Sequence, residues 1–507
     1  MGEVVTVPVP VSRTGVNYID GPDAPDSRPI TDARYLLNCY PLGASVNVRG
    51  GLDCHCLVNS SMTIDGLFSL PLITGSEKLY ASTRAPTNAL VDVSTDTYAD
   101  VTGSTVPTNR NFQSTVFGHR LYLCNGEDTV QVSTGSGNFS DSTFTGVDLT
   151  TLVNVSSFKE RIYFIEKDTA TFWYGDTQAI GFSALNSFDL SYFLKRGGYL
   201  LFAGSFTNQI ATTSADLFMA VTSEGEVFFY QGSSPADASW GLVARYKIGK
   251  PLGCNAFVEV DNDTWILTDG GIIPVSFLFS GTSTVALNVV SRKINPLISQ
   301  YALETPFSPL WWGKYWSQGK RVFVSIPTGP TSTLLAVCNI ETGAWCTYQY
   351  TNDSALCMSV YDGAPYIGGI EGEVSLAETG HSDNGEAIAY DMKLPFSYYG
   401  AQKNYKVWRD IRPLIYTTAG TKLNLSVQTN YQDTPTADTV TTTPGAIDTP
   451  WGAAWGSDWS SGAKYYYDWY SLRGQGHSGA IRVSGAVKDA PLQFIGFDLR
   501  FEIGGPV

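Results

Sequence analysis

The chain has 507 residues, of which 16% are charged, 43% hydrophobic and 13% aromatic, and its net charge is −15. This acidity argues against a protein that grips nucleic acid by its phosphates or binds an anionic membrane through a basic surface. Abundant glycine among β-branched and aromatic residues predicts many short strands joined by tight turns, and a helix-rich fold is disfavoured because no long segment has apolar residues at helical spacing.

Residues 1–60 form the first predicted element, an extended N-terminal arm. Its first residues lack the basic and apolar regions of a signal peptide, so we expect synthesis in the cytosol. We expect the arm to pack on its own domain, to pair at a sheet edge or to reach a neighbouring subunit. A helix is ruled out because proline fixes φ and lacks an amide hydrogen, and the arm contains Pro8, Pro10, Pro22, Pro25, Pro29 and Pro41.

Residues 61–385 carry a repeat of about 40 residues. A basic, an aliphatic and an aromatic residue follow one another at Lys78-Leu79-Tyr80, Arg120-Leu121-Tyr122, Arg161-Ile162-Tyr163 and Arg321-Val322-Phe323. The first three marks are spaced by 42 and 41 residues. Such a period, with about four short strands per repeat, is typical of a propeller blade, so the sequence predicts an all-β propeller of about seven blades, in a range of six to eight. One short helix is expected near residues 295–302.

Residues 386–507 no longer follow the repeat. Apolar and polar residues alternate in segments 422–427 and 496–501, which predicts the strands of a small C-terminal β-sandwich. A long loop rich in Thr, Pro and Gly, residues 432–463, interrupts these strands. Aromatic residues in and beside so polar a loop are candidates for contact with another chain, although packing in the sandwich core is the alternative. The candidate interface residues are Trp451, Trp455, Trp459, Tyr465, Tyr466 and Tyr467.

The sequence offers no recognisable catalytic, cofactor or metal motif. The four histidines, His55, His119, His381 and His477, do not accompany a nucleophile motif, and no glycine-rich loop leads from a strand into a helix. The eight cysteines include no CxxC pair, and Cys54-His55-Cys56 is too tightly spaced for a usual zinc site. We therefore expect free, buried thiols, no catalytic residues, no metal and no cofactor.

A propeller that binds or cleaves carbohydrate is the main alternative function. Cleavage requires two or three carboxylates that converge on the central channel, and the number of Asp and Glu residues cannot exclude it. The repeated Ser-x-Asp-x-Gly-x-Thr-Trp turns of sialidase-type propellers are absent, with Ser382-Asp383-Asn384-Gly385 as a fragment at best. The tyrosine cluster and the spaced tryptophans would serve equally to stack on sugar rings.

Several segments in order along the chain resemble a known protein family. They are residues 34–41 and 48–52 near the start, 158–164, 217–232 and 339–345 in the middle, and 494–501 at the end. In the order of these segments and in the residues within each of them, the chain resembles the tail hub or nozzle proteins of short-tailed bacteriophages, also called DNA-stabilisation or tail accessory proteins. The loop 432–463 and the Cys54-His55-Cys56 run have no counterpart in that pattern.

The resemblance implies a structural protein of the virion tail, assembled in the host cytoplasm. It implies a homohexameric ring below the portal and the adaptor, in contact with other tail proteins, that continues the DNA channel and retains and then releases the genome. It implies no catalytic residue. Six copies would bring about 90 negative charges around one axis, so we expect genomic DNA to pass through the lumen without specific binding, and we hypothesise that the acidic surface faces this lumen.

Overall fold

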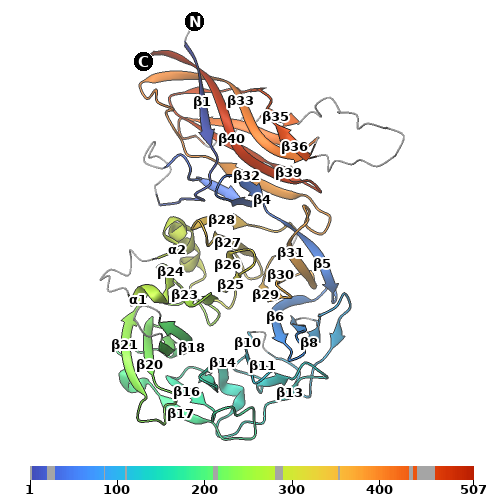
Figure 1. Ribbon diagram of the computed structural model, residues 1–507, viewed down its shortest axis with the longest axis vertical. Coiled ribbons are helices and arrows are strands. Elements are labelled where there is room, and N and C mark those ends of the chain that lie inside the picture. The colour runs from blue at the N-terminus through green and yellow to red at the C-terminus, as the bar shows by residue number, and fades with distance from the viewer. Residues whose placement is uncertain are drawn as a thin grey trace. The chain divides into compact units, whose positions relative to one another are not determined.

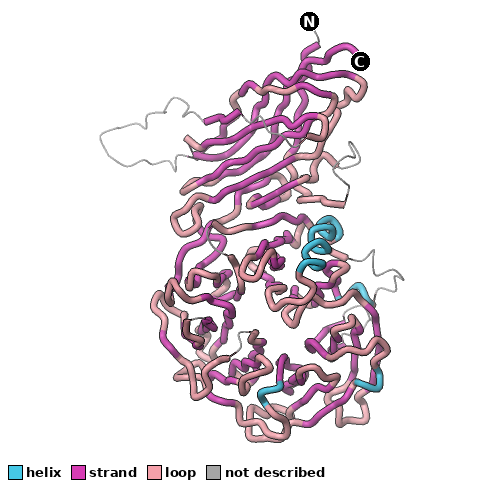
Figure 2. Tube along the Cα trace, turned by 180° about the vertical axis from the view of Figure 1, so that it is seen from behind, coloured by secondary structure: helices cyan, strands magenta, loops and turns pink. Residues whose placement is uncertain are grey.

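The chain folds into two compact units in a computed structural model (Figures 1 and 2). The propeller unit comprises residues 54–334 and 353–376, and the terminal unit comprises residues 1–53, 335–352 and 377–507. Strands predominate, and the described α-helices are the short α1 (Val275–Leu278) and α2 (Asn295–Glu304), the latter at the predicted position. The structure describes residues 3–19, 29–84, 86–108, 111–208, 215–279, 289–351, 354–418, 420–432, 438–441 and 463–506.

Six antiparallel sheets of three or four strands form the blades of the propeller and surround a central axis (Figure 1). The first two contain β6 (Thr63–Pro71), β7 (Glu77–Arg84), β8 (Ala89–Asp92) and β9 (Ala99–Asp100), then β10 (Gln113–Phe117), β11 (Arg120–Cys124), β12 (Gln131–Ser133) and β13 (Ser140–Asp141). The next two contain β14 (Leu152–Phe158), β15 (Arg161–Glu166), β16 (Thr171–Tyr174) and β17 (Asn186–Asp189), then β18 (Leu200–Asn208), β19 (Ala215–Thr222), β20 (Glu226–Gln231) and β21 (Gly241–Lys247). The last two contain β22 (Phe257–Val260), β23 (Asp263–Thr268) and β24 (Gly271–Pro274), then β29 (Cys357–Tyr361), β30 (Ala364–Gly368), β31 (Glu373–Thr379) and β5 (Gly51–Leu57).

The repeat marks of the sequence fall at one structural position. Lys78-Leu79-Tyr80, Arg120-Leu121-Tyr122 and Arg161-Ile162-Tyr163 begin or lie within β7, β11 and β15, the second strand of each blade. The aliphatic and aromatic residues of these marks are buried between neighbouring sheets, as in the cluster that joins Tyr80 of one blade to Leu121 of the next. The all-β propeller is therefore confirmed, and its repeat reflects this packing between blades.

The six blades lie at the lower end of the predicted range because β25 (Gly313–Trp316) and the strand after it belong to a larger sheet and do not form a separate blade. The mark Arg321-Val322-Phe323 lies in β26 (Arg321–Pro327), which forms a hairpin with β25. Strand β25 packs against β22 on one side and β29 on the other. Strand β5 closes the ring because it pairs with β31 in the last blade. Directly after β5, the amide of Val58 donates to the carbonyl of Gly372 at 3.0 Å.

The terminal unit contains two groups of paired strands. One consists of β1 (Glu3–Pro10), β3 (Cys39–Pro41), β4 (Val46–Val48), β40 (Leu492–Pro506), β33 (Asn404–Thr418), β36 (Ala463–Tyr466), β37 (Tyr470–Ser471) and β38 (Gln475–Gly476). The other consists of β27 (Thr333–Asn339), β28 (Ala344–Tyr348), β2 (Tyr35–Leu37), β32 (Ile388–Lys393), β39 (Gly479–Val487), β34 (Lys422–Thr429) and β35 (Asp438–Thr441).

Buried aromatic residues join these two groups of strands face to face. The ring of Tyr390 on β32 lies 5.8 Å from that of Phe494 on β40. Trp408 on β33 packs so closely on Gly479 of β39 that a Cβ there would lie 2.6 Å from the indole. Facing sheets with such a shared core are what the expected C-terminal sandwich requires.

The N-terminal arm is extended as expected but belongs to the sheets of the terminal unit. Strand β1 pairs antiparallel with β40, β2 pairs with β32, and β4 pairs with β40. The predicted boundaries after residues 60 and 385 therefore differ from the observed units, which intermix segments distant in sequence. Pro8 and Pro10 fit β1 because this strand pairs on one side with β40, and an edge strand tolerates the missing amide hydrogens.

The predicted loop 432–463 is partly a strand. Residues 438–441 form β35 and pair with β34, with Leu423 opposite Val440. Residues 433–437 and 442–462 lie outside the described part of the chain, and they include Trp451, Trp455 and Trp459.

Candidate functional sites

The tyrosine cluster separates into one core residue and two exposed residues. Tyr466 on β36 is 5% exposed and belongs to the core of the terminal unit. Tyr465 and Tyr467 are 58% and 63% exposed. Because side chains alternate along a strand, neighbouring tyrosines point to opposite faces of the sheet. The structure thus supports Tyr465 and Tyr467 as surface aromatics and assigns Tyr466 to the core alternative.

Two arginines stack on a tryptophan on the outer face of the same sheet. The guanidinium carbons of Arg412 and Arg500 lie 4.9 and 4.2 Å from the ring centre of Trp469. Arg412 donates to Asp498 through Nε at 2.8 Å, and Arg500 donates to Asp410 at 3.3 Å. These carboxylates hold both arginines in place on β33 and β40. We call Arg412, Arg500, Trp469, Tyr465 and Tyr467 the aromatic–arginine face.

The composition of this face suits contact with another protein. Trp, Tyr and Arg are the residue types that contribute most to binding at protein interfaces. Tyr465 is steadied by Tyr416, whose ring centre lies 5.2 Å away. Sequence reasoning missed the two arginines because they come from strands separated by most of the domain, although Arg412 and Arg500 each occupy a polar position in an alternating strand.

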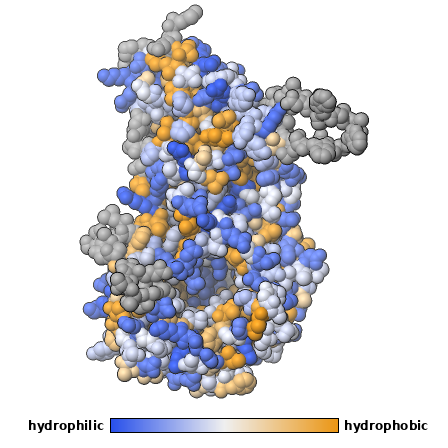
Figure 3. Space-filling view, viewed as in Figure 1, coloured by the Kyte–Doolittle hydropathy of each residue, from blue (hydrophilic) through white to orange (hydrophobic). Residues whose placement is uncertain are grey.

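A cavity of about 400 Å³ lies among the inner strands of the propeller unit. Its walls come from β6, β10, β22, β25 and β29, and Figure 3 shows a hollow within the ring that is lined largely by hydrophilic residues. Polar side chains that line it include Asp65, Gln113, Glu259 and Lys314. The cavity is therefore a recess of ligand size in the propeller unit around which charged groups gather.

The charged side chains of this cavity differ in whether they have hydrogen-bond or ion-pair partners. Asp65 accepts a hydrogen bond from Ser82 at 2.9 Å and lies 3.9 Å from Arg84. Glu259 and Lys314 make no hydrogen bond or ion pair to a residue that the structure describes. The surrounding protein lowers the pKa of Lys314, and the negative charge of Glu259 partly opposes this shift.

A second cavity, of about 280 Å³, shares part of its wall with the first. The shared residues include Gln113 of β10 and Asn255, which precedes β22. The side-chain amide of Gln113 donates to that of Asn255, so this hydrogen bond joins two segments of the propeller unit that are distant in sequence.

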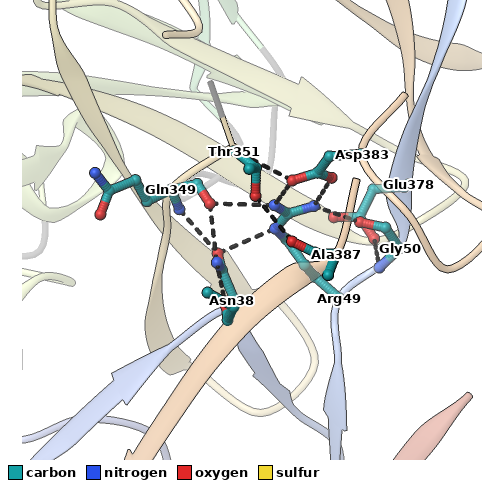
Figure 4. A network of polar contacts seen from close by, with 9 residues as sticks. Asn38, Arg49, Gly50, Gln349, Thr351, Glu378, Asp383 and Ala387 are labelled. Atoms are coloured by element: carbon teal, nitrogen blue, oxygen red, sulfur yellow. Dashed lines mark hydrogen bonds and ion pairs between the residues drawn. The ribbon is translucent and has the colours of Figure 1, made fainter. Parts of the chain in front are cut away.

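A buried ion pair ties three segments of the terminal unit together (Figure 4). Arg49 donates to both carboxylate oxygens of Asp383, at 2.7 and 2.6 Å, and both side chains are at most 1% exposed. Its remaining donors reach the side chain of Asn38 at 3.0 Å and the carbonyls of Gly50 at 2.9 Å and Gln349 at 3.1 Å. Because every donor is directed at a protein acceptor, this network is a structural element and not a ligand site.

All eight cysteines are free, as predicted. Six are buried, Cys254 is partly buried, and Cys54 differs from the expectation because it is exposed. Among the residues that the structure describes, no group of three His, Cys, Asp or Glu side chains is placed to hold a metal ion. No described helix is long and apolar enough to cross a membrane.

Comparison with known proteins does not assign this chain to a family. No family model matches the chain, and no curated protein matches it. Among solved structures, the chain is similar to one described as YCF48 bound to D1 peptide, with a TM-score of 0.37 and 12% identity over 65% of this chain and 97% of that chain. Similarity at this level carries no information about ligands or partners.

Proposed function

We propose that this protein is a structural component of a short phage tail, a nozzle or hub ring that continues the DNA channel and helps to retain and then release the genome. One observation carries the proposal beyond composition. Parts of the segments that resemble the tail proteins near the start and at the end of the chain lie in one sheet, where β3 and β4 pair with each other and β4 pairs with β40. This proximity of the two ends of the pattern supports the proposal.

We place the DNA channel between subunits and not within one propeller. The two cavities, of about 400 and 280 Å³, are of a size for small molecules, and Gln113 and Asn255, which line both, are hydrogen-bonded to each other. A ring of six copies around a common axis would supply the lumen, and its acidity would keep phosphates from adhering to the wall.

The aromatic–arginine face is the surface that we assign to contact with an adjoining tail protein or the adaptor. It combines exposed Tyr465 and Tyr467 with a Trp469 that already stacks on two arginines. A surface whose side chains are ordered before binding loses less conformational entropy when a partner docks.

Carbohydrate cleavage is less well supported by the same cavity. Hydrolysis by the usual route needs two carboxyl groups that flank the scissile bond. Of the two described carboxylates that line the larger cavity, Asp65 is engaged by Ser82 and Arg84, which leaves Glu259 as the free one. We therefore infer a protein that acts through interfaces and not through catalysis.

Light scattering combined with electron microscopy of the purified full chain tests the ring. Six copies of the 55.0 kDa chain predict a particle of about 330 kDa with a central hole. The double variant Tyr465→Ser/Trp469→Ser tests the aromatic–arginine face. Its control is Tyr192→Ser, which removes an aromatic side chain that is 92% exposed on the propeller unit. If the wild-type protein is a 55 kDa monomer at all concentrations, with or without its tail partners, the proposal is wrong.

A further inference from the structure

The larger cavity of the propeller unit gathers three polar groups that have no hydrogen-bond partner among the described residues. They are the indole N–H of Trp312, which is buried, and the ammonium of Lys314 and the carboxylate of Glu259, which belong to exposed residues. Trp312 is only 6% exposed, so its N–H has little access to bulk water. A buried donor without a partner costs free energy, which a ligand that supplies an acceptor would recover.

The two charges lie on adjacent inner strands. Lys314 follows Gly313 on β25, and Glu259 follows Val258 on β22. These strands approach so closely that a Cβ on Gly313 would lie 2.7 Å from the Cβ of Val258. Lys314 and Glu259 nevertheless form no ion pair, while the charge of Glu259 still influences the pKa of Lys314. The opposite charges thus stand near one another and leave a space that a ligand can bridge.

The rest of the wall favours a ligand with several hydroxyl groups. Trp312 and Tyr315 provide aromatic surface, and Ser114 and Ser359 add hydroxyl-bearing residues. A volume of about 400 Å³ accommodates one or two sugar rings. An ammonium selects a carboxylate, and a carboxylate accepts from hydroxyl groups, so the two charges together match a sugar that carries an acid group.

We propose that this cavity binds an acidic sugar, a mono- or disaccharide bearing a carboxylate. The sugar carboxylate accepts from the ammonium of Lys314, ring hydroxyls donate to Glu259, and the N–H of Trp312 donates to a sugar oxygen. Binding involves no bond cleavage. This inference is independent of the proposed ring, since the cavity lies wholly within one propeller unit.

Titration calorimetry and ligand-observed NMR of the full chain test this proposal with three probes. D-glucuronate supplies the carboxylate and hydroxyls, methyl glucoside supplies hydroxyls alone, and glycylglycine supplies a carboxylate with an ammonium. The variants are Lys314→Met and Glu259→Gln, and Lys247→Met on the outer strand β21 is the matched control. We expect glucuronate to bind best, and each cavity variant to weaken its binding by about tenfold or more while the control leaves it unchanged.

Three results would overturn the proposal. One is no saturable binding of glucuronate. Another is equal binding of glucuronate and methyl glucoside, because the ammonium would then contribute nothing. The third is tighter binding of glycylglycine, which would identify a peptide site. Thermal unfolding of each variant checks its folding, and Glu259→Gln retains the test if Lys314→Met is unstable. The particle mass, measured on the same samples, reports on the ring separately.

Discussion

Replacing Arg49 with Met removes the guanidinium from the most completely buried ion pair of the terminal unit. Asp383 would lose two hydrogen bonds, of 2.7 and 2.6 Å, and would keep the one that it accepts from the amide of Thr351 at 3.0 Å. Asn38 and the carbonyl of Gln349 would each lose a donor as well. Breaking a buried pair by removing one partner typically costs 3–5 kcal/mol, so we expect a loss of about 4 kcal/mol in the stability of the terminal unit.

The assay is urea unfolding combined with hydrogen exchange of the terminal-unit strands, because the two units need not unfold together. Arg409→Met is the matched control, since Arg409 pairs with Glu502 at the surface and is 51% exposed in its side chain. An exposed pair of this kind contributes at most about 1 kcal/mol. The double variant Arg49→Met/Asp383→Leu should recover part of the loss, because no uncompensated charge remains. The reasoning is refuted if Arg49→Met costs no more than Arg409→Met.

Three further predictions concern packing, pH and thiol reactivity. Gly479→Ala should destabilise the terminal unit by about 1–3 kcal/mol in urea unfolding, because its methyl group would collide with Trp408; an unchanged midpoint would contradict the packing. Burial alone would raise the pKa of Asp92, but hydrogen bonds from Lys78 and Ser94 and the charge of Lys78 outweigh it and lower this pKa, so Asp92→Asn should cost stability at pH 7. The difference from wild type should shrink as the pH falls below the ordinary carboxyl value of 3.8; a difference that does not shrink as the pH falls would contradict this. Cys54 should react first with a thiol reagent in the native state, since Cys56 is buried and the pKa of its thiol is raised to about 11; mass spectrometry identifies the site, and faster labelling of Cys56 would be inconsistent with the structure.

The propeller could be predicted from the sequence because its signal is local and repeated. Each mark, such as Arg120-Leu121-Tyr122, sits on one strand, and its neighbours in sequence pair beside it. The terminal unit lacks such a signal. Its sheets join β1 to β40 and β2 to β32, pairings between opposite ends of the chain that no short pattern can reveal.

The candidate sites show the same limit. The tyrosines were found by composition, but strand alternation divides them into the exposed Tyr465 and Tyr467 and the buried Tyr466. The stack on Trp469 requires arginines from β33 and β40, and the cavity requires Glu259 and Lys314 from separate hairpins. The residues of each group stand in no recognisable sequence pattern, and only the folded chain brings them together.

Cryo-electron microscopy of the assembled full chain tests the central proposal most directly. The proposal predicts a closed six-fold ring, with a lumen wide enough for a DNA duplex between subunits and an acidic wall along it. Particles without a lumen, or a lumen lined by basic residues that retain DNA, would contradict a nozzle through which the genome slides.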